Sequence, residues 1–166
     1  GIGAEFGRNI NASTGFEQTQ YMLNNIPIIR EGIIDSCLLV LHDYAHYVTC
    51  APEEIDAERK VIHEEWRTTR SVRDRIYEQT LPRLFPDSNR YAYRTPIGLM
   101  EVVDNFPHQA LRDYYPKWYR PDLQAIIVVG DIDVDRTEAK IKEMFSPIAM
   151  PENPAKRIYY GVDDNE

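Results

Sequence analysis

Residues 50–66, CAPEEIDAERKVIHEEW, carry the clearest helix signal in the chain and place several chemically useful side chains on that helix. Pro52 suits the first helical turn, where its missing N–H costs nothing, and Glu53 and Glu54 favour the positive end of the helix dipole. The segment predicts a long helix that begins near Pro52 and reaches the low seventies.

Two carboxylates share one side of this helix. Glu58 and Glu65 are seven residues apart, close to two turns, and Val61 and Ile62 fall between them on the same side. Burying an unpaired carboxylate costs several kcal/mol, so an apolar face of this kind needs a cation, a hydrogen-bond donor or a metal. The alternative is that both glutamates lie at the edge of the face and reach water.

The other polar residues of the helix have a simpler interpretation. His63 and Glu64 point away from the Glu58 side, and Arg59 and Arg67 are close enough to be their ion-pair neighbours. We expect a solvated face there.

The pattern before this helix changes from alternation to helical spacing. The first twenty-five residues alternate and predict two adjacent strands joined by a turn at Thr14 and Gly15. After Pro27, apolar residues at helical spacing predict a buried helix of about five turns. Its apolar stripe consists of Ile33, Ile34, Cys37, Leu38, Leu41, Tyr44, Ala45 and Val48.

The pattern after it predicts further helices and one more strand. Residues 71–96 are typical of a short helix plus a loop, and Pro107 opens a helix that contains HQALRDYYPKWY. LQAIIVVGDID predicts a strand that ends in a turn, and DRTEAKIKEMF predicts an amphipathic helix. This order predicts an α+β fold with helices packed on a largely antiparallel sheet.

Charge and hydropathy exclude two classes of partner. The net charge is −8, and the nineteen basic residues are scattered among twenty-seven acidic ones, so no basic stripe is available for nucleic acid or an anionic membrane. The apolar runs CLLVL and AIIVV are much shorter than the roughly 20 residues that span a bilayer. The first residues, GIGAEFG, carry no signal-peptide pattern, and we expect an excised piece of a longer protein.

The two cysteines predict no disulfide. If Cys37 and Cys50 lie on one helix they are about 20 Å apart, too far to be bridged. We interpret them as small apolar side chains, and their redox state stays open.

A second metal-binding pattern competes with the glutamate pair. HDYAH, residues 42–46, spaces His42 and His46 as in the zinc motif HExxH, with Asp43 in place of its glutamate and Glu64 or Glu65 downstream as a third ligand. Aspartate is one methylene shorter and would hold a zinc-bound water poorly. Paired histidines at a helix rim are more often plain surface residues.

Four segments, taken in order, resemble the pitrilysin or insulinase (M16) family of zinc peptidases, and most of all its bacterial zinc protease branch. They are NINASTGFEQTQYML, EIDAERKVIHEEWR, YAYRTPIGLMEVV and LRDYYPKWYRPDLQAIIVVGDID. The resemblance runs from about Phe6 to Phe145. It implies a LuxS/MPP-like metallohydrolase fold, with residues 1–150 as a truncated N-terminal peptidase domain and 151–166 as a linker or the start of the next segment.

The resemblance also implies roles for the two glutamates. Such enzymes hold zinc by an HxxEH motif and a glutamate roughly 75 residues downstream. Glu65 would be this third zinc ligand and Glu58 the supporting catalytic carboxylate. The sequence contains no HxxEH, and counting back from Glu65 leads upstream of Gly1. We therefore expect a fragment of the catalytic half that does not hydrolyse peptides alone and binds no zinc tightly.

For the intact protein the resemblance implies zinc-assisted hydrolysis of peptides or unfolded polypeptides, with an upstream glutamate taking a proton from zinc-bound water. It implies that the substrate lies along an edge strand at Asn11, Ala12, Ser13 and Thr14, held by main-chain groups of Ala12 and Ser13; an ordinary mid-sheet strand is the alternative.

It implies a homologous second M16 domain or subunit that closes over the first, and by family analogy the periplasm or cell envelope of a bacterium. Two other hypotheses stay open: a non-catalytic structural half, against which the retained glutamates argue, and a self-contained HDYAH zinc site.

Overall fold

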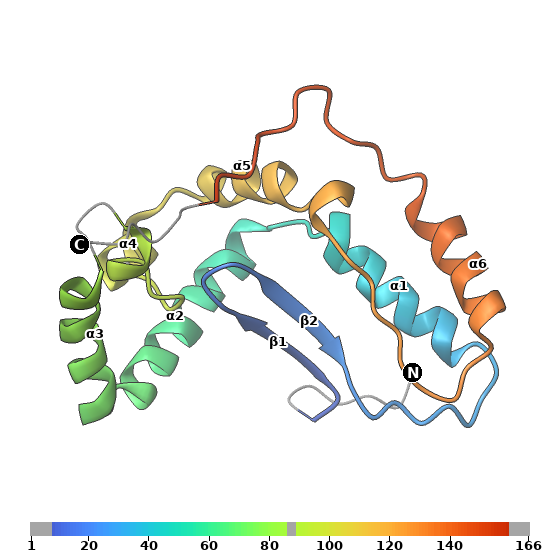
Figure 1. Cartoon of the computed structure of the whole chain (residues 1–166), viewed down its shortest axis with the longest axis horizontal. Helices are drawn as coiled ribbons and strands as arrows, with labels where there is room; N and C mark the ends of the chain where they lie inside the picture. The colour runs from blue at the N-terminus through green and yellow to red at the C-terminus, as the bar shows by residue number, and fades with distance from the viewer. Residues whose placement is uncertain (1–7, 86–88, 160–166) are drawn as a thin grey trace. The chain divides into compact units, whose positions relative to one another are not determined.

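The computed structural model describes residues 8–85 and 89–159, and the chain forms two compact units (Figure 1). Unit 1 comprises Gly1–Ser13, Thr19–Thr49 and Arg112–Ala155; unit 2 comprises Thr14–Gln18, Cys50–Leu111 and Lys156–Glu166. Expectations that concern residues 1–7, 86–88 and 160–166 lie outside the described residues. They include the start of the resemblance at Phe6 and the last part of the predicted 151–166 segment.

The predicted pair of strands is present as an antiparallel hairpin, β1 (Ile10–Thr14) and β2 (Thr19–Leu23). The N–H of Asn24 donates to the carbonyl of Asn9, and the N–H of Gly15 donates to the carbonyl of Gln18, both at 2.8 Å. These two bonds lie at opposite ends of the hairpin and set one register for the strands between them.

The predicted apolar helix is α1 (Ile33–His46), which packs against β2 and against α6 (Val134–Phe145) within unit 1. Leu38 is 1% exposed and forms the centre of this packing, with Ile33 also buried. The helix ends before the predicted last member of its stripe, Val48, which is exposed. The α+β arrangement of helices on a small antiparallel sheet is confirmed.

Two polar side chains anchor the last turns of α5 (His108–Trp118) and the segment after it within unit 1. The hydroxyl of Tyr115 donates to the Tyr44 carbonyl at 2.7 Å. Arg120, only 3% exposed, precedes η2 (Pro121–Leu123) and donates to Asp122 at 2.8 Å and to the carbonyl of Ala155. The YPKWYRP stretch therefore holds the end of α5 and the chain after it in place through the side chains of Tyr115 and Arg120.

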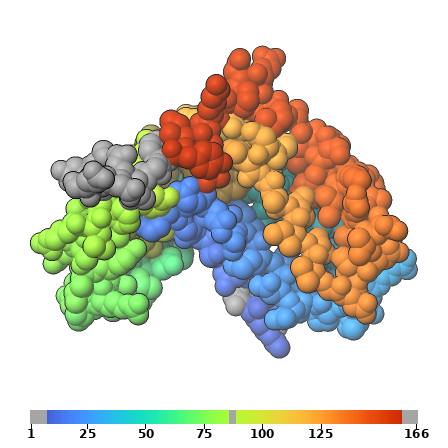
Figure 2. Space-filling model, viewed as in Figure 1, coloured from blue at the N-terminus to red at the C-terminus, as the bar shows by residue number. Residues whose placement is uncertain are grey.

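Unit 2 contains α2 (Pro52–Thr69), α3 (Val72–Leu84), η1 (Arg90–Ala92) and α4 (Met100–Asn105). Helix α2 begins at Pro52 as predicted. Ser71 starts α3 with a capping box, in which its N–H donates to Asp74 Oδ2 at 3.0 Å while its hydroxyl accepts from the Asp74 N–H at 3.3 Å. Figure 2 shows the atoms of α3 in green at one end of the view. Helix α4 is absent from the sequence prediction.

The predicted strand LQAIIVVGDID is wrong. Residues 124–129 form no ladder with any other described segment, and Ile127 and Val129 are 81% and 90% exposed. Apolar alternation favours an extended backbone, but a strand also requires a neighbour for its N–H and C=O groups. Among the described residues this segment has none.

Two smaller expectations concern the cysteines and the membrane. Cys37 and Cys50 are free thiols, and Cys50 lies outside α1 with a φ of 48°. In residues 8–85 and 89–159 no helix has the length and apolarity needed to cross a bilayer.

Leu38→Ala tests the packing of unit 1. Removing this side chain should lower the free energy of unfolding by about 2–5 kcal/mol, because it leaves a cavity beside β2 and α6. Leu39→Ala is the matched control, since Leu39 is 51% exposed, and it should change stability by about 0.5 kcal/mol or less. Urea unfolding followed by circular dichroism measures both, and equal losses would contradict the assigned core.

Candidate functional site

Helix α2 presents Glu58 and Glu65 on an open side. Both residues are exposed, and Val61 between them is 54% exposed. Neither carboxylate has a hydrogen bond or an ion pair among the described residues. Of the two arrangements considered from the sequence, the one in which both glutamates reach water describes this chain.

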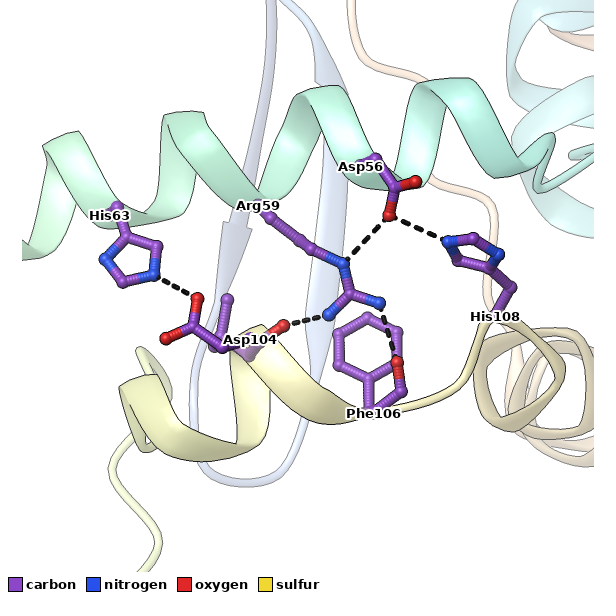
Figure 3. Close-up of polar contacts among 7 residues, drawn as sticks. Asp56, Arg59, His63, Asp104, Phe106 and His108 are labelled. Carbon is purple, nitrogen blue, oxygen red and sulfur yellow. Dashed lines mark hydrogen bonds and ion pairs between the residues drawn. The ribbon is translucent and has the colours of Figure 1, made fainter.

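Another side of α2 is held by Arg59 (Figure 3). Its guanidinium donates to the carbonyl of Phe106 at 2.6 Å and to the carbonyl of Val103, and it lies 3.9 Å from the centre of the Phe106 ring. Its Nε donates to Asp56 at 3.2 Å. Both carbonyls belong to the C-terminal end of α4, where backbone acceptors lack helical partners. One side chain therefore fixes α4 and the following turn on α2.

Two histidines flank this arginine contact (Figure 3). Nε2 of His63 lies 2.6 Å from Asp104 Oδ1, and Nε2 of His108 lies 2.7 Å from Asp56 Oδ1. The hydrogen bond from His108, followed by that from Arg59, lowers the pKa of the Asp56 carboxyl. An ionised carboxylate only accepts, so each imidazole carries its hydrogen on Nε2.

The sequence prediction for this side of α2 is partly confirmed. Glu64 pairs with Arg67 at 2.7 Å, and this contact lowers the pKa of the Glu64 carboxyl. His63 instead binds Asp104, forty-one residues away in sequence, and Arg59 binds backbone carbonyls of α4 and the turn after it. A signal for Arg59 does exist: it follows buried Ile55 by four residues and therefore lies on the packed side of the helix.

The predicted substrate strand is β1. With Asn9 opposite Asn24 and Gly15 opposite Gln18, alternation directs the main-chain groups of Asn11 and Ser13 toward β2. The groups of Ala12 point to the other edge of the hairpin. There the Ala12 N–H is bonded to the side-chain oxygen of Asn11 at 2.9 Å. In this register Ala12 faces the outer edge and Ser13 faces β2, and the role of the strand in substrate binding stays a prediction.

The HDYAH histidines pack against aromatic rings. His42 stacks on Tyr47 at 4.6 Å between ring centres and meets Phe145 edge-on at 5.3 Å, while His46 meets Tyr47 at 5.3 Å. In the described part of the chain no group of three His, Cys, Asp or Glu residues could hold a metal ion. A third ligand for His42 and His46 is therefore absent there.

Comparisons with known proteins agree on one family. A family model described as "Peptidase M16 inactive domain" matches residues 105–164. A Haemophilus influenzae protein named "Probable zinc protease PqqL" is 35% identical over 153 residues, which cover 92% of this chain and 16% of that protein.

Two solved structures of proteases are also similar to this chain. The crystal structure of the first half of the periplasmic protease PqqL from Escherichia coli matches 96% of this chain and 34% of its own, with a TM-score of 0.85 and 32% identity. A mutant of the ferredoxin protease FusC, in complex with Arabidopsis ferredoxin, matches with a TM-score of 0.87 and 30% identity, over 97% of this chain and 18% of its own.

The chain belongs to the M16 peptidase family. It spans about one sixth of the length of the curated relatives it matches. Within this M16 chain the family model covers residues that follow α2, whereas Glu58 and Glu65 precede them.

The M16 chain fits one ligand position of a zinc site and not a whole site. Protein zinc sites use three or four ligands from Cys, His, Asp and Glu. Glu65 offers an exposed carboxylate without a competing partner among the described residues, and Glu58 offers a second one about two turns away. No imidazole or thiol completes a set of three with them in residues 8–85 and 89–159.

Arg59→Lys tests the contact that fixes α4 on α2. Lysine keeps the charge but cannot donate to both carbonyls while lying flat on Phe106, so the free energy of unfolding should fall by about 1–3 kcal/mol. Arg67→Lys is the control, because among the described residues exposed Arg67 bonds through its side chain to Glu64 alone, and it should be nearly neutral. Thermal and urea unfolding compare the two; equal effects would contradict the special role of Arg59.

Asp56→Asn tests the acid dependence of the same cluster. A lowered carboxyl pKa contributes stability that is complete above the ordinary aspartate pKa near 3.9 and is lost as the pH falls through the lower folded value. The stability difference between wild type and variant should therefore be largest near about pH 6 and shrink toward about pH 3. Urea midpoints across this range measure it. A difference that stays constant would show that Asp56 does not titrate as described.

Proposed function

We propose that the intact protein is a zinc-dependent endopeptidase of the M16 family and that this chain supplies Glu65 as a zinc ligand and Glu58 as the carboxylate that supports it. The observation that carries the proposal is the contrast on α2. Glu64 and Asp56 are engaged by neighbours, while Glu58 and Glu65 share an open side and have no partner in the described residues. Carboxylates kept free in this way are available to a metal.

The roles proposed for Glu58 and Glu65 come from the family resemblance, and the open side of α2 is compatible with them. Glu65 would donate a carboxylate oxygen to zinc, and Glu58 would place a second negative charge about two helical turns away. Arg59 would hold α2 in a fixed orientation about its axis through its contacts with Val103 and Phe106. Bound zinc supplies Lewis-acid activation of water and of the scissile carbonyl.

The substrate would be a peptide or an unfolded polypeptide in an extended conformation. Main-chain groups on the outward edge of β1 can add such a segment to the hairpin as a further strand. Ala12 is central to this edge, while Asn11, Ser13 and Thr14 complete the strand. A peptide would have to displace the Asn11 side chain from the Ala12 N–H.

The surroundings of the site are proposed from the relatives. One matched structure is the first half of a periplasmic protease, which supports a homologous second M16 half as the partner and a bacterial periplasm as the compartment. Residues 1–150 would belong to the N-terminal peptidase domain, with 151–166 as a linker or the start of the next segment. This chain alone would be inactive, because it lacks HxxEH.

A non-catalytic half is the second candidate, and the name "Peptidase M16 inactive domain" favours it. That match begins at residue 105 and so bears on the later part of the chain alone. The glutamates on α2 lie before it, and they favour the catalytic reading of the earlier part.

Single substitutions in the full-length protein test the proposal. Glu65→Gln should lower bound zinc at least tenfold by elemental analysis and abolish peptidase activity, because the amide is a much weaker zinc ligand than the carboxylate. Glu58→Gln should lower activity more than zinc content. Glu64→Gln is the matched control, since Glu64 is engaged by Arg67, and it should leave both unchanged.

Two outcomes would contradict the proposal. If Glu64→Gln and Glu65→Gln have the same effect, Glu65 has no specific role. If His42→Ala removes the zinc while Glu65→Gln does not, the metal site belongs to the HDYAH segment.

A further inference from the structure

The side chain of Glu65 has no contact in the described part of the chain that could orient it. Its carboxylate has no hydrogen-bond or ion-pair partner in residues 8–85 and 89–159. Its carbonyl accepts from the hydroxyls of Thr68 and Thr69 at 3.1 and 2.7 Å, but these two bonds are local to the last turn of α2. The direction of the carboxylate therefore depends on what fixes the backbone of the helix around it.

Helix α4 holds α2 at two successive turns (Figure 3). Arg59 donates to two backbone carbonyls at the end of α4. One turn further along α2, Nε2 of His63 lies 2.6 Å from Oδ1 of Asp104. A helix held at one point can pivot about that point, whereas a second contact along its length removes this freedom.

The position of His63 on α2 favours control of Glu65. Arg59 precedes Glu65 by six residues, about 9 Å along the helix axis, whereas His63 precedes it by two residues, about 3 Å. At about 100° per residue, the side chains of His63 and Glu65 leave the helix on nearly opposite sides. A rotation of the backbone that separates His63 from Asp104 would therefore swing Glu65 through the same angle.

A contact with α3 near the end of α2 is weaker. Arg70 follows the helix, and its guanidinium lies 3.8 Å from the carboxylate of Glu78, with both side chains 39% exposed. This separation is too long for a hydrogen bond. The ion pair restrains the turn after α2 more than the helix that carries Glu65.

We propose that His63 and Asp104 are positioning residues for Glu65, a role that rests on the proposed function in one respect, that Glu65 binds the metal. Their hydrogen bond would fix the last part of α2 on α4, so that the carboxylate on the other side of the helix keeps the direction that a zinc ligand needs. Both residues would act through the backbone of α2 and would not touch the metal.

The exposure of the pair favours this role over a purely stabilising one. The side chains of His63 and Asp104 are 38% and 53% exposed. Ion pairs that reach water contribute little to the free energy of unfolding. A short bond that joins two helices across forty-one residues of sequence restricts geometry more than it adds stability.

The pair formed by Asp56 and His108 provides a matched control on the same helix. Its atoms lie 2.7 Å apart, and its side chains are 57% and 33% exposed, so it resembles the first pair in length and exposure. Asp56 precedes Glu65 by nine residues, about 13 Å along the axis. Loss of this pair leaves the contacts of Arg59 and His63 between the break and Glu65.

The zinc affinity of the full-length protein, measured by competition with a chromogenic chelator, tests the positioning role. His63→Ala and Asp104→Ala should each weaken zinc binding about tenfold, the lower end of the effect of residues that orient metal ligands. The two changes together should weaken it no more than either alone, because both remove the same bond. His108→Ala should leave the affinity unchanged.

Conservative variants and a double variant separate positioning from damage to the fold. His63→Gln keeps an N–H donor near the place of Nε2, and Asp104→Asn keeps an oxygen acceptor, so both should retain most of the affinity. In the Glu65→Gln background, His63→Ala should cause no further loss, whereas damage to the fold would add to the loss. His63→Ala and His108→Ala should lower the melting temperature by similar, small amounts.

Four results would overturn the positioning role. These are wild-type zinc affinity in His63→Ala, equal losses in His63→Ala and His108→Ala, equal losses in Asp104→Asn and Asp104→Ala, or a further loss when His63→Ala is added to Glu65→Gln. Each of them leaves the proposed function intact as long as Glu65→Gln alone weakens zinc binding. If Glu65→Gln leaves zinc binding unchanged, the proposed function is wrong and the positioning role is wrong with it.

Discussion

The geometry of unit 2 depends on the guanidinium of Arg59. At the C-terminal end of a helix, backbone carbonyls lack intrahelical donors and carry partial negative charge, so a cation there satisfies both requirements. Arg59 meets the carbonyls of Val103 and Phe106 while its flat face covers the Phe106 ring. A planar side chain held at three points cannot rotate without breaking one of these contacts, and this restricts rotation of α2 about its own axis.

Different sides of α2 therefore serve packing and the proposed ligand binding. Ile55 and Arg59 on one side make the contacts that hold the helix, and the histidine–aspartate pairs at His63 and His108 add two more. Glu58 and Glu65 on another side take no part in them. Carboxylates that do not contribute to packing can be aimed at a ligand without a cost in stability, provided that the scaffold behind them is rigid.

The elements that the sequence predicts well are those whose signals are local. The hairpin turn at Gly15, the stripe of α1, the Pro52 start of α2 and the period of α6 all depend on residues within a few turns of each other. Helix α4 has six residues and no side-chain cap, so propensity gives it little signal. Its place on α2 comes from Arg59, whose partners are 44 and 47 residues away, a separation that periodicity cannot detect.

In residues 125–129 the sequence pattern predicts the alternation of side chains but not the pairing of the strand. Ile126 and Val128 are half-buried while Ala125, Ile127 and Val129 are exposed, so the side chains do alternate as the sequence predicts. What is missing from the described part of the chain is a neighbouring strand, and no property of the segment itself can supply one. The same limit applies to α2, where the helical period places Glu58 and Glu65 on one side but is silent on what binds them. Their assignment to zinc comes from the family resemblance. Such an assignment requires carboxylates that are exposed and uncommitted, and within residues 8–85 and 89–159 neither one has a hydrogen-bond or ion-pair partner.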